Sequence, residues 1–297
     1  MSEDRPYFIA CHDAGAANII MSQELAEGFE AAFYCLEGPA CKKWLPLVPS
    51  NKVCSDIHYA ISKCKMLRSG TGWASDFEHN ARNMALNAGL HVTAVVDHWV
   101  NYEQRFIRHG EKVLPNAIEV MDTYAKALAE KTFPDIPVEL KHNFYLDMTA
   151  HKARSAVIER TNDILYVLEP VPEDWGCEHE IAEEFQALNY FSEFIKYRFN
   201  KPYDQIRLRL HPSETIQKYA IWAQQNQDLN VVFDHYDDIE TSIANAKWVF
   251  GCESYGLIVA LHCDKQVYST IPHWAPLARL PHSKLRQLRD FMPIETN

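Results

Sequence analysis

Short apolar stretches alternate with longer amphipathic stretches along the chain. Tyr7–Ala10 is apolar and ends in the small and polar residues 11–18, and apolar residues then recur at helical spacing over Ile19–Phe29. The β-branched run His91–Val96 is typical of a strand buried on both faces of a parallel sheet. The same patterns predict further strands at Ala31–Leu36, Met66–Leu67, Lys112–Leu114, Ala117–Met121 and Val138–Leu140, and helices at Asp76–Ala88 and Asp122–Lys131.

The pattern restarts after a charged stretch at residues 150–162. A strong strand, Ile164–Leu168, opens the second series. The series continues with helices at Glu178–Phe199, Glu214–Gln225, Ile239–Ala246 and Tyr255–His262, and with strands at Gln205–Leu210, Asn230–Phe233, Trp248–Phe250 and Gln266–Tyr268. We therefore expect an α/β fold of two Rossmann-like domains facing a cleft, over residues 1–155 and 156–297. In such folds ligands bind at the carboxyl ends of the strands.

Charge and composition limit the classes of partner. The chain has 29 Lys+Arg against 40 Asp+Glu, a net charge of −11, without a run of Lys or Arg. Such a protein repels phosphate backbones, so we expect no nucleic-acid partner. No apolar stretch approaches the roughly 20 residues of a membrane span, and no secretory signal opens the chain. The 8 Cys include no C-x-x-C pair, so we expect a soluble cytoplasmic protein with reduced thiols.

In the C-terminal half, the strand Gln205–Leu210 ends in His211-Pro212. Pro212 suits the first turn of a helix, because the N–H that proline lacks has no partner there. The start of a helix offers free N–H groups to an anion. His211 is placed to donate to a phosphate or to protonate a leaving one, with Arg209 and Ser213 as further phosphate contacts. The alternative is an ordinary loop histidine.

A second junction of strand and helix follows at residues 250–256. Ser254 and the backbone at Tyr255 are expected to bind phosphate oxygens, and Glu253 to accept from a ribose or sugar hydroxyl, although Ser254 is equally a good N-cap. Between the two junctions lies an acidic turn that contains Asp238 and Glu240. These carboxylates are candidates for the ribose hydroxyls of a nucleotide, or form only an acidic helix start.

This order of motifs resembles the nucleotide-binding half of GT-B glycosyltransferases. A strand ending in His211-Pro212, then an acidic helix start, then a loop with Ser254 opening a helix, is similar to the bacterial sialyltransferases and Kdo transferases. The resemblance covers roughly residues 164–272. It implies that the His-Pro and serine motifs bind the CMP part of a CMP-sugar.

The same resemblance implies a candidate general base. Those families carry an acid-acid-glycine motif for this role, and the similar segment here is Glu173-Asp174-Trp175-Gly176, in which Trp175 interrupts the motif. Asp174 is therefore one candidate base. The serine pair of those families is replaced here by Glu253-Ser254.

The N-terminal half offers another candidate base at the end of its first strand. An inverting transfer needs a carboxylate or imidazole that takes the proton of the acceptor hydroxyl. Asp13 with His12 beside it fits this need, or the roles are reversed; the alternative is that Asp13 caps the following helix. Gly15 lets a ligand approach the backbone, but the segment is not G-x-G-x-x-G and predicts no dinucleotide site.

The loop after His91–Val96 is polar and aromatic. Trp99 and Tyr102 are expected to stack on a sugar, or alternatively to pack against the next helix. Three further side chains of this loop are candidates for hydroxyls or an acceptor carboxylate: Asp97, Asn101 and Arg105. The loop 69–72 belongs to the same edge without a specific assignment.

The sequence predicts an inverting glycosyltransferase that needs no metal, since it contains neither a helical His motif nor a D-x-D motif between apolar strands. No cofactor is expected besides the nucleotide-sugar co-substrate. The candidate donor is a nonulosonic acid or Kdo from a CMP-sugar. The expected acceptor is a glycan or lipid-linked molecule of the bacterial surface, with peripheral contact with the inner membrane.

Three alternatives remain open. A UDP-N-acetylglucosamine 2-epimerase-like enzyme needs no acceptor. A non-catalytic nucleotide-sugar-binding subunit needs no base, and a DNA-sugar transferase needs a basic face. The sequence leaves the acceptor and the oligomeric state open.

Overall fold

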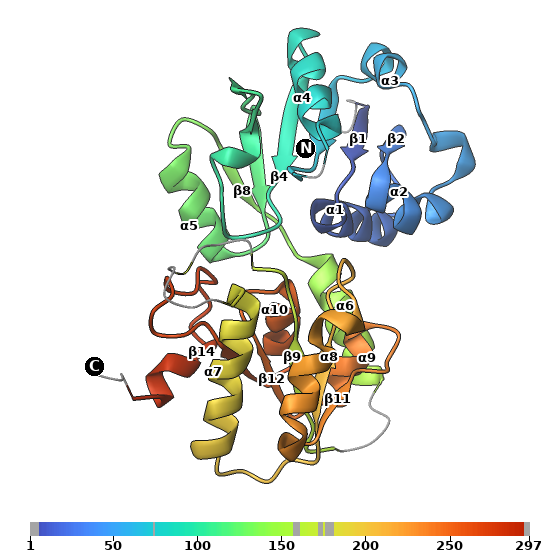
Figure 1. The fold of residues 1–297 in the computed structure, drawn as a ribbon. Helices are drawn as coiled ribbons and strands as arrows, with labels where there is room; N and C mark the ends of the chain where they lie inside the picture. The colour runs from blue at the N-terminus through green and yellow to red at the C-terminus, as the bar shows by residue number, and fades with distance from the viewer. Residues whose placement is uncertain (1–5, 74, 157–160, 172–174, 176–180, 294–297) are drawn as a thin grey trace. The chain divides into compact units, whose positions relative to one another are not determined.

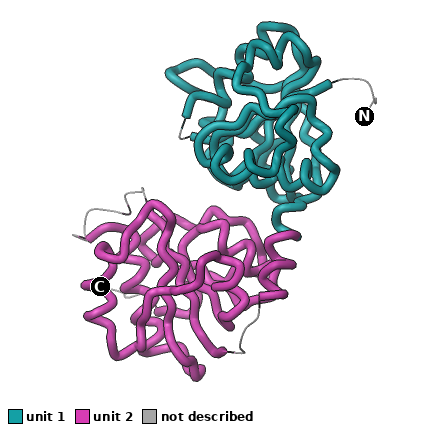
Figure 2. Tube along the Cα trace, turned by 90° about the vertical axis from the view of Figure 1, so that its right-hand side faces the viewer, with its two compact units in different colours: residues 1–147 teal, residues 148–297 magenta. Residues whose placement is uncertain are grey.

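The computed structural model describes residues 6–73, 75–156, 161–171, 175 and 181–293 (Figure 1). The chain divides into two compact units, residues 1–147 and 148–297, which Figure 2 colours separately. The division falls within helix α6 (Phe144–Ser155), and the expected boundary at 155 is the end of the same helix. Each unit is described on its own below.

Unit 1 contains a six-stranded parallel sheet in the order β2-β1-β3-β4-β7-β8. Its strands are β1 (Tyr7–Cys11), β2 (Phe33–Leu36), β3 (Met66–Ser69), β4 (His91–Val95), β7 (Ala117–Val120) and β8 (Val138–Leu140). Its helices before α6 are α1 (Ala14–Glu27), α2 (Gly38–Trp44), α3 (Ile57–Lys63), α4 (Phe77–Asn87) and α5 (Thr123–Thr132).

Strand β1 shows why the sheet of unit 1 is buried on both faces. Phe8 and Ala10 belong to one apolar cluster, whereas Ile9 and Cys11 belong to another. Successive side chains of a strand point to opposite faces, so helices must cover both faces of this sheet. The carboxyl ends of the strands remain at one edge of the sheet, where the loops gather.

Unit 2 repeats this plan with the order β11-β10-β9-β12-β13-β14, again parallel throughout. Its strands are β9 (Ile164–Val167), β10 (Ile206–Arg209), β11 (Val231–Phe233), β12 (Trp248–Gly251), β13 (Gln266–Ser269) and β14 (Arg286–Gln287). Its helices after α6 are α7 (Glu183–Tyr197), α8 (Ile216–Gln225), α9 (Ile239–Ala244) and α10 (Tyr255–His262).

The core of unit 2 is rich in aromatic side chains. Phe250 stacks on Tyr268 with ring centroids 4.7 Å apart, and Phe191 lies 4.9 Å from both Phe250 and Tyr166. Such rings bury large apolar areas, so they stabilise the contact between the sheet and α7. The predicted fold class, α/β with two Rossmann-like domains, is confirmed.

Three predicted elements differ from the structure. The helix predicted from Glu214 begins at Ile216, and Pro212 and Ser213 lie in a turn that the Glu214 N–H closes on the His211 carbonyl (2.9 Å). Pro212 is therefore not in a first helical turn. The helix predicted from Glu178 begins, in its described part, at Glu183.

The third difference is the strand predicted at Lys112–Leu114. It shortens to β6 (Glu111–Lys112), which pairs antiparallel with β5 (Ile107–Arg108) and lies outside the main sheet. Hairpin pairing between neighbours in the sequence replaces the expected pairing with the parallel sheet.

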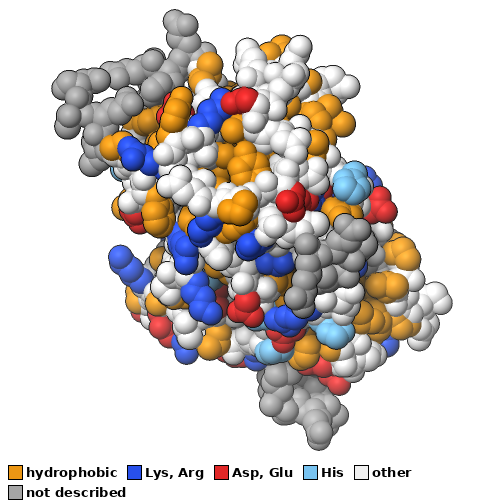
Figure 3. Space-filling view, turned by 90° about the horizontal axis from the view of Figure 1, so that it is seen from below, with side chains coloured by type: hydrophobic (Ala, Val, Ile, Leu, Met, Phe, Trp, Pro, Cys, Tyr) orange, Lys and Arg blue, Asp and Glu red, His pale blue; other side chains and the backbone are white. Residues whose placement is uncertain are grey.

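The charge on the surface and the length of the helices concern two classes of partner, nucleic acids and membranes. On the face drawn in Figure 3, the described Lys and Arg side chains lie interspersed with acidic and apolar ones. Within the described ranges, none of the helices is both long enough and apolar enough to cross a bilayer.

A buried ion network in unit 2 gives a test of the fold. Arg207 is fully buried and donates to Asp163 (2.8 Å), to Asp234 (2.5 Å) and to the carbonyls of Ser242 and Asn245. Asp163→Ala leaves this guanidinium with one carboxylate, so we expect the free energy of unfolding to fall by about 3 kcal/mol in urea denaturation. The control Glu103→Ala breaks an exposed pair with Lys112 and should cost under about 1 kcal/mol. An equal loss of unfolding free energy in the two variants would contradict the conclusion that the buried network stabilises unit 2 more than an exposed pair does.

Candidate functional site

The carboxyl ends of β1, β3 and β4 bring polar side chains of unit 1 together. We call the strand-end cluster the group His12, Asp13, Glu78, Asp97 and Arg105. His12 and Asp13 follow β1, Asp97 follows β4, and Glu78 lies at the start of α4. The predicted candidates His12, Asp13 and Asp97 are thus near neighbours at one edge of a sheet, as the strand-end argument requires.

His12 and Asp13 form a hydrogen-bonded pair. Their Nδ1 and Oδ1 atoms are 2.7 Å apart, and the other carboxylate oxygen of Asp13 accepts from the Trp73 N–H at 2.6 Å. Asp13 occupies the N-cap position of α1, yet its side chain makes no capping hydrogen bond. The capping alternative for Asp13 therefore does not describe this side chain. The pair combines two groups that are able to transfer a proton.

Glu78 ties two loops of this edge together. Its buried carboxylate accepts from the backbone N–H of His12 (2.8 Å) and from that of Gly72 (2.5 Å). Burial raises the pKa of Glu78, while these two N–H groups and Arg82 act in the opposite direction. Glu78 fixes the backbone that carries His12 and Asp13, and sequence reasoning missed it because His12 lies 66 residues away along the chain.

Several side chains of the strand-end cluster lie close against glycine backbone. A Cβ atom on Gly15 would lie 1.7 Å from Asp97 Oδ2, and one on Gly72 would lie 2.0 Å from Asp13 Oδ2. The same holds for Gly70 against Glu78 Oε1 and for Gly38 against His12 Nε2, both at 2.4 Å. Loops from several strands are therefore shaped around these side chains.

Some side chains of the loop after β4 belong to the strand-end cluster, and others are buried in the core. Asp97 pairs with Arg105 at 2.7 Å, and Arg105 also donates to the Thr71 hydroxyl at 3.2 Å. Trp99 and Tyr102 are only 8% and 6% exposed, and they donate to Asp122 and to the Ala125 carbonyl at the start of α5. This is the packing alternative, so their predicted stacking on a sugar is not supported.

Two further residues were predicted to contact the acceptor, Asn101 and Gly15. Asn101 is exposed, with a left-handed φ of 57°, and its carbonyl accepts from the Arg105 N–H. Gly15 lies in the first turn of α1, directly against Asp97. Their contact with an acceptor stays a prediction.

In unit 2, His211 is held in one tautomer at the end of β10. Its Nδ1 atom accepts from the Ser213 N–H at 3.2 Å and lies 2.7 Å from the Ser213 hydroxyl. Because Nδ1 accepts, the proton of the neutral ring is on Nε2. His211 thus presents an N–H donor at the carboxyl edge of the sheet, beside the exposed Pro212.

Arg209 holds the acidic loop that follows β11. Its guanidinium donates to Asp234 (2.8 Å), to the Tyr236 carbonyl (2.6 Å) and to the Ser242 hydroxyl (3.0 Å). Several of its N–H groups are therefore committed within the protein. A contact with phosphate, as predicted from the sequence, would have to use the remaining ones.

The acidic turn itself begins α9. The Asp238 carboxylate accepts from the Thr241 N–H (2.8 Å) and pairs with Lys152 (2.7 Å), and Glu240 lies 3.9 Å from the same ammonium. Burial acts to raise the pKa of Asp238, but Lys152 and the Thr241 N–H outweigh burial and lower the pKa to about 2. Both predicted ribose contacts thus face a lysine in this structure.

A carboxyl group of the protein already lies at the loop that leads into α10. The Glu169 carboxylate, after β9, accepts from the backbone N–H groups of Glu253 and Ser254, the latter at 3.0 Å. The Ser254 hydroxyl accepts from the Gly256 N–H as an N-cap, and Glu253 pairs with Arg279 at 2.6 Å. Glu169 therefore uses two N–H groups just before α10, while the phosphate contact predicted for Ser254 and the backbone at Tyr255 stays a prediction.

Burial raises the pKa of Glu169 to about 7, against the opposing effect of the N–H groups it accepts from. Glu169 is the first polar residue after a buried strand, so the strand-end argument used for Asp13 would have found it. Asp174 lies outside the described residues. Its neighbour Trp175 is buried against Ala187, Cys252 and Ile271.

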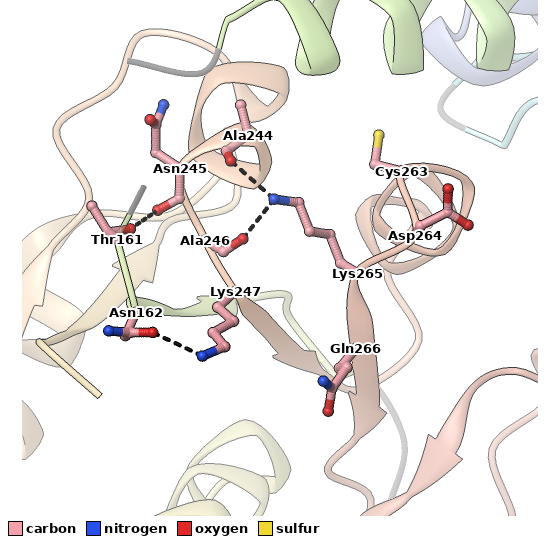
Figure 4. Close-up of a pocket in the computed structure, with 10 residues that line it drawn as sticks. All are labelled: Thr161, Asn162, Ala244, Asn245, Ala246, Lys247, Cys263, Asp264, Lys265 and Gln266. Carbon is pink, nitrogen blue, oxygen red and sulfur yellow. Dashed lines mark hydrogen bonds between the residues drawn. The ribbon is translucent and has the colours of Figure 1, made fainter. Parts of the chain in front are cut away.

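A hollow of about 540 Å³ lies elsewhere in unit 2 (Figure 4). Thr161 and Asn162 precede β9, and Lys247 precedes β12, so the hollow lies at the amino ends of the strands. The Lys265 ammonium fills part of its wall and donates to the carbonyls of Ala244 and Ala246. No predicted site residue lines it. Over the described ranges, no three His, Cys, Asp or Glu side chains are grouped to hold a metal ion.

Comparison with known proteins gives matches at the level of structure. No protein family and no curated protein matches this chain. The structure of UDP-GlcNAc 2-epimerase from Methanocaldococcus jannaschii is similar over 89% of this chain and 83% of that one, with a TM-score of 0.58 and 11% sequence identity. A glycosyltransferase of kitacinnamycin is similar over 97% and 90%, with a TM-score of 0.49 and 11% identity.

At such identity the likeness to the epimerase shows the fold alone. It agrees with the two parallel Rossmann-like sheets of this chain. The finer resemblance to sialyltransferases and Kdo transferases stays a prediction.

The Glu169 carboxylate gives a pH-dependent test. Its pKa of about 7 exceeds the ordinary 4.5, so the folded protein retains a proton that the unfolded chain releases, and wild-type stability falls as the pH rises from 4.5 through 7. Glu169→Gln keeps an oxygen for both N–H groups and cannot ionise. We expect its free energy of unfolding, relative to wild type, to rise over this window by up to about 1.4 kcal/mol per pH unit.

Urea denaturation between about pH 5 and about pH 8 measures this difference, with the exposed Glu30→Gln as the control. If the difference in the free energy of unfolding between Glu169→Gln and wild type were as independent of pH as that of the control, Glu169 would have an ordinary pKa.

Proposed function

We propose that the protein is a GT-B-type glycosyltransferase that transfers a sugar from a nucleotide-activated donor with inversion. The observation that carries the proposal is the His12–Asp13 pair, held at 2.7 Å at the carboxyl end of β1. A paired carboxylate and imidazole at the ligand edge of a Rossmann-like sheet fits the need for a base that deprotonates an acceptor hydroxyl.

The chemistry divides between the two units. Asp13 takes the proton of the acceptor hydroxyl, with the His12 imidazole hydrogen-bonded to its carboxylate, or the two residues exchange these roles. The acceptor oxygen forms a bond to the anomeric carbon as the bond from that carbon to the donor phosphate breaks. The Nε2–H of His211 donates to the departing phosphate oxygen and stabilises its charge.

The donor and the acceptor are the finer part of the proposal. The order of His211-Pro212, the acidic turn and Ser254 supports a CMP-linked nonulosonic acid or Kdo as the sugar donor. Asp174 remains the other candidate base. A glycan or lipid-linked acceptor at the cytoplasmic side of the inner membrane would complete the reaction, with no metal ion and no cofactor.

A sugar-nucleotide epimerase of the UDP-N-acetylglucosamine 2-epimerase kind is the second candidate. The strand-end cluster favours it in one respect, since His12 and Asp13 together offer two proton-transfer groups at one place. An epimerase converts its sugar nucleotide without an acceptor. A third candidate, a binding subunit, would take up the nucleotide sugar without turnover.

Nucleotide binding tests the role of unit 2. We expect calorimetry to show micromolar binding of CMP in preference to UDP, GDP, TDP and ADP, equal with and without Mg²⁺. His211→Ala should weaken CMP binding by about tenfold, the value of one hydrogen bond to a charged group. The matched control is His142→Ala, which removes an exposed histidine of unit 1.

The outcomes of this panel differ in meaning. Preference for UDP would reject the CMP-sugar donor and favour another GT-B-like enzyme or the epimerase. Binding of none of the five nucleotides would reject the proposed function.

Turnover tests the base. Asp13→Asn keeps the shape of the side chain but cannot accept the proton, so we expect the transfer rate to fall by about 10²- to 10⁴-fold with nucleotide affinity unchanged. The control is Asp56→Asn, because Asp56 is an acid that does cap a helix, accepting from the Tyr59 N–H. Loss of turnover in both variants would contradict a specific role, and product formed without an acceptor would favour the epimerase.

A further inference from the structure

An exposed tryptophan lies beside the strand-end cluster. Trp73 follows the glycine-rich end of β3 and is 47% exposed, whereas the two aromatic side chains predicted for ligand contact, Trp99 and Tyr102, are buried. The backbone N–H of Trp73 donates to the Asp13 carboxylate at 2.6 Å. Trp73 thus contacts the candidate base through its backbone and carries a large apolar ring that is partly open to solvent.

The indole of Trp73 is held by two arginines. The guanidinium carbons of Arg105 and Arg108 lie 5.9 and 5.3 Å from its ring centroid, within the range of a cation–π contact. Arg105 is fixed by Asp97, and Arg108 by the carbonyls of Gly72 and Ile107. An exposed ring with such supports keeps its position before any ligand binds, which lowers the entropy lost on binding.

The polar groups near the ring indicate what it would bind. The N–H groups of Arg105 and Arg108 named above are turned toward acceptors of the protein, while Asp13 offers partly exposed carboxylate oxygens. A ligand that fits has an apolar face for the indole and hydroxyl donors at its edge. A neutral pyranose has both, since its axial C–H groups form one face and its hydroxyls lie at the rim.

We propose that Trp73 is the stacking platform of a carbohydrate subsite in unit 1, which takes the C–H face of a neutral pyranose while Asp13 accepts from one of its hydroxyls. This inference deepens the proposed function, on which it rests, by naming the side chain of unit 1 against which the acceptor sugar packs. It also narrows the acceptor to one that ends in an uncharged sugar. In this proposal Trp73 makes the aromatic contact with the sugar that was predicted from the sequence for Trp99 and Tyr102.

The test measures sugar binding without turnover. The probes are the methyl glycosides of glucose, galactose and N-acetylglucosamine, studied by saturation-transfer NMR with the full chain. We expect transfer to be strongest at the C–H protons of one ring face. Trp73→Ala should weaken binding by about tenfold, and Trp73→Phe should restore most of it, because an aromatic face remains.

A matched control separates stacking from general damage to the fold. Trp274 in unit 2 is 45% exposed and donates to Gln186, so Trp274→Ala should leave sugar binding unchanged. Thermal unfolding of each variant shows whether it is folded. Absence of sugar binding in the wild type, or equal binding by Trp73→Ala, would overturn the platform.

Calorimetry with CMP distinguishes this proposal from the proposed function. Loss of CMP affinity in Trp73→Ala, with sugar binding intact, would show that the ring stacks on a base and would overturn the carbohydrate assignment. Sugar binding through Trp73 in a protein that binds no nucleotide would keep the platform and reject the glycosyltransferase.

Discussion

A carboxylate that accepts from two backbone N–H groups organises the loop edge in each unit. Glu78 joins the loops after β1 and β3, and Glu169 joins its own position after β9 to the loop after β12. In both units the joined strands are direct neighbours in the sheet. Burial raises the pKa of both carboxyl groups and so disfavours their charged forms. Each side chain nevertheless keeps its place, because the N–H groups that donate to it would otherwise lack partners.

This arrangement determines how the rest of the edge is built. Glu78 holds the His12 backbone, and that backbone places Asp13 against the Trp73 N–H. Gly72 fits this arrangement, because its N–H donates to Glu78 while a Cβ atom on it would meet the Asp13 carboxylate. The placement of the candidate base therefore depends on one buried side chain, Glu78, which holds the backbone on both sides of it.

Unit 2 uses the same device with a different result. Glu169 accepts from the N–H groups of Glu253 and Ser254 just before α10, and Arg209 and Lys152 are committed to the acidic loop. The Nδ1 atom of His211 accepts from the Ser213 N–H, which leaves Nε2 as the nitrogen that carries the proton of the neutral ring. The donor side of the proposed reaction therefore rests more on His211 than on the anion site that the helix start offers.

The sequence by itself determined the two series of strands and helices and the strand ends at which polar residues gather, because periodicity and strand ends are local properties of the chain. It placed His12, Asp13, Asp97 and His211 at those strand ends correctly. Only the tertiary structure decided which polar groups satisfy one another. Glu78 meets His12 across 66 residues, Trp73 meets Asp13 across 60, and Glu169 meets Glu253 across 84. No local pattern encodes such pairs, since they arise where loops from separate strands converge and each buried polar group must find a partner.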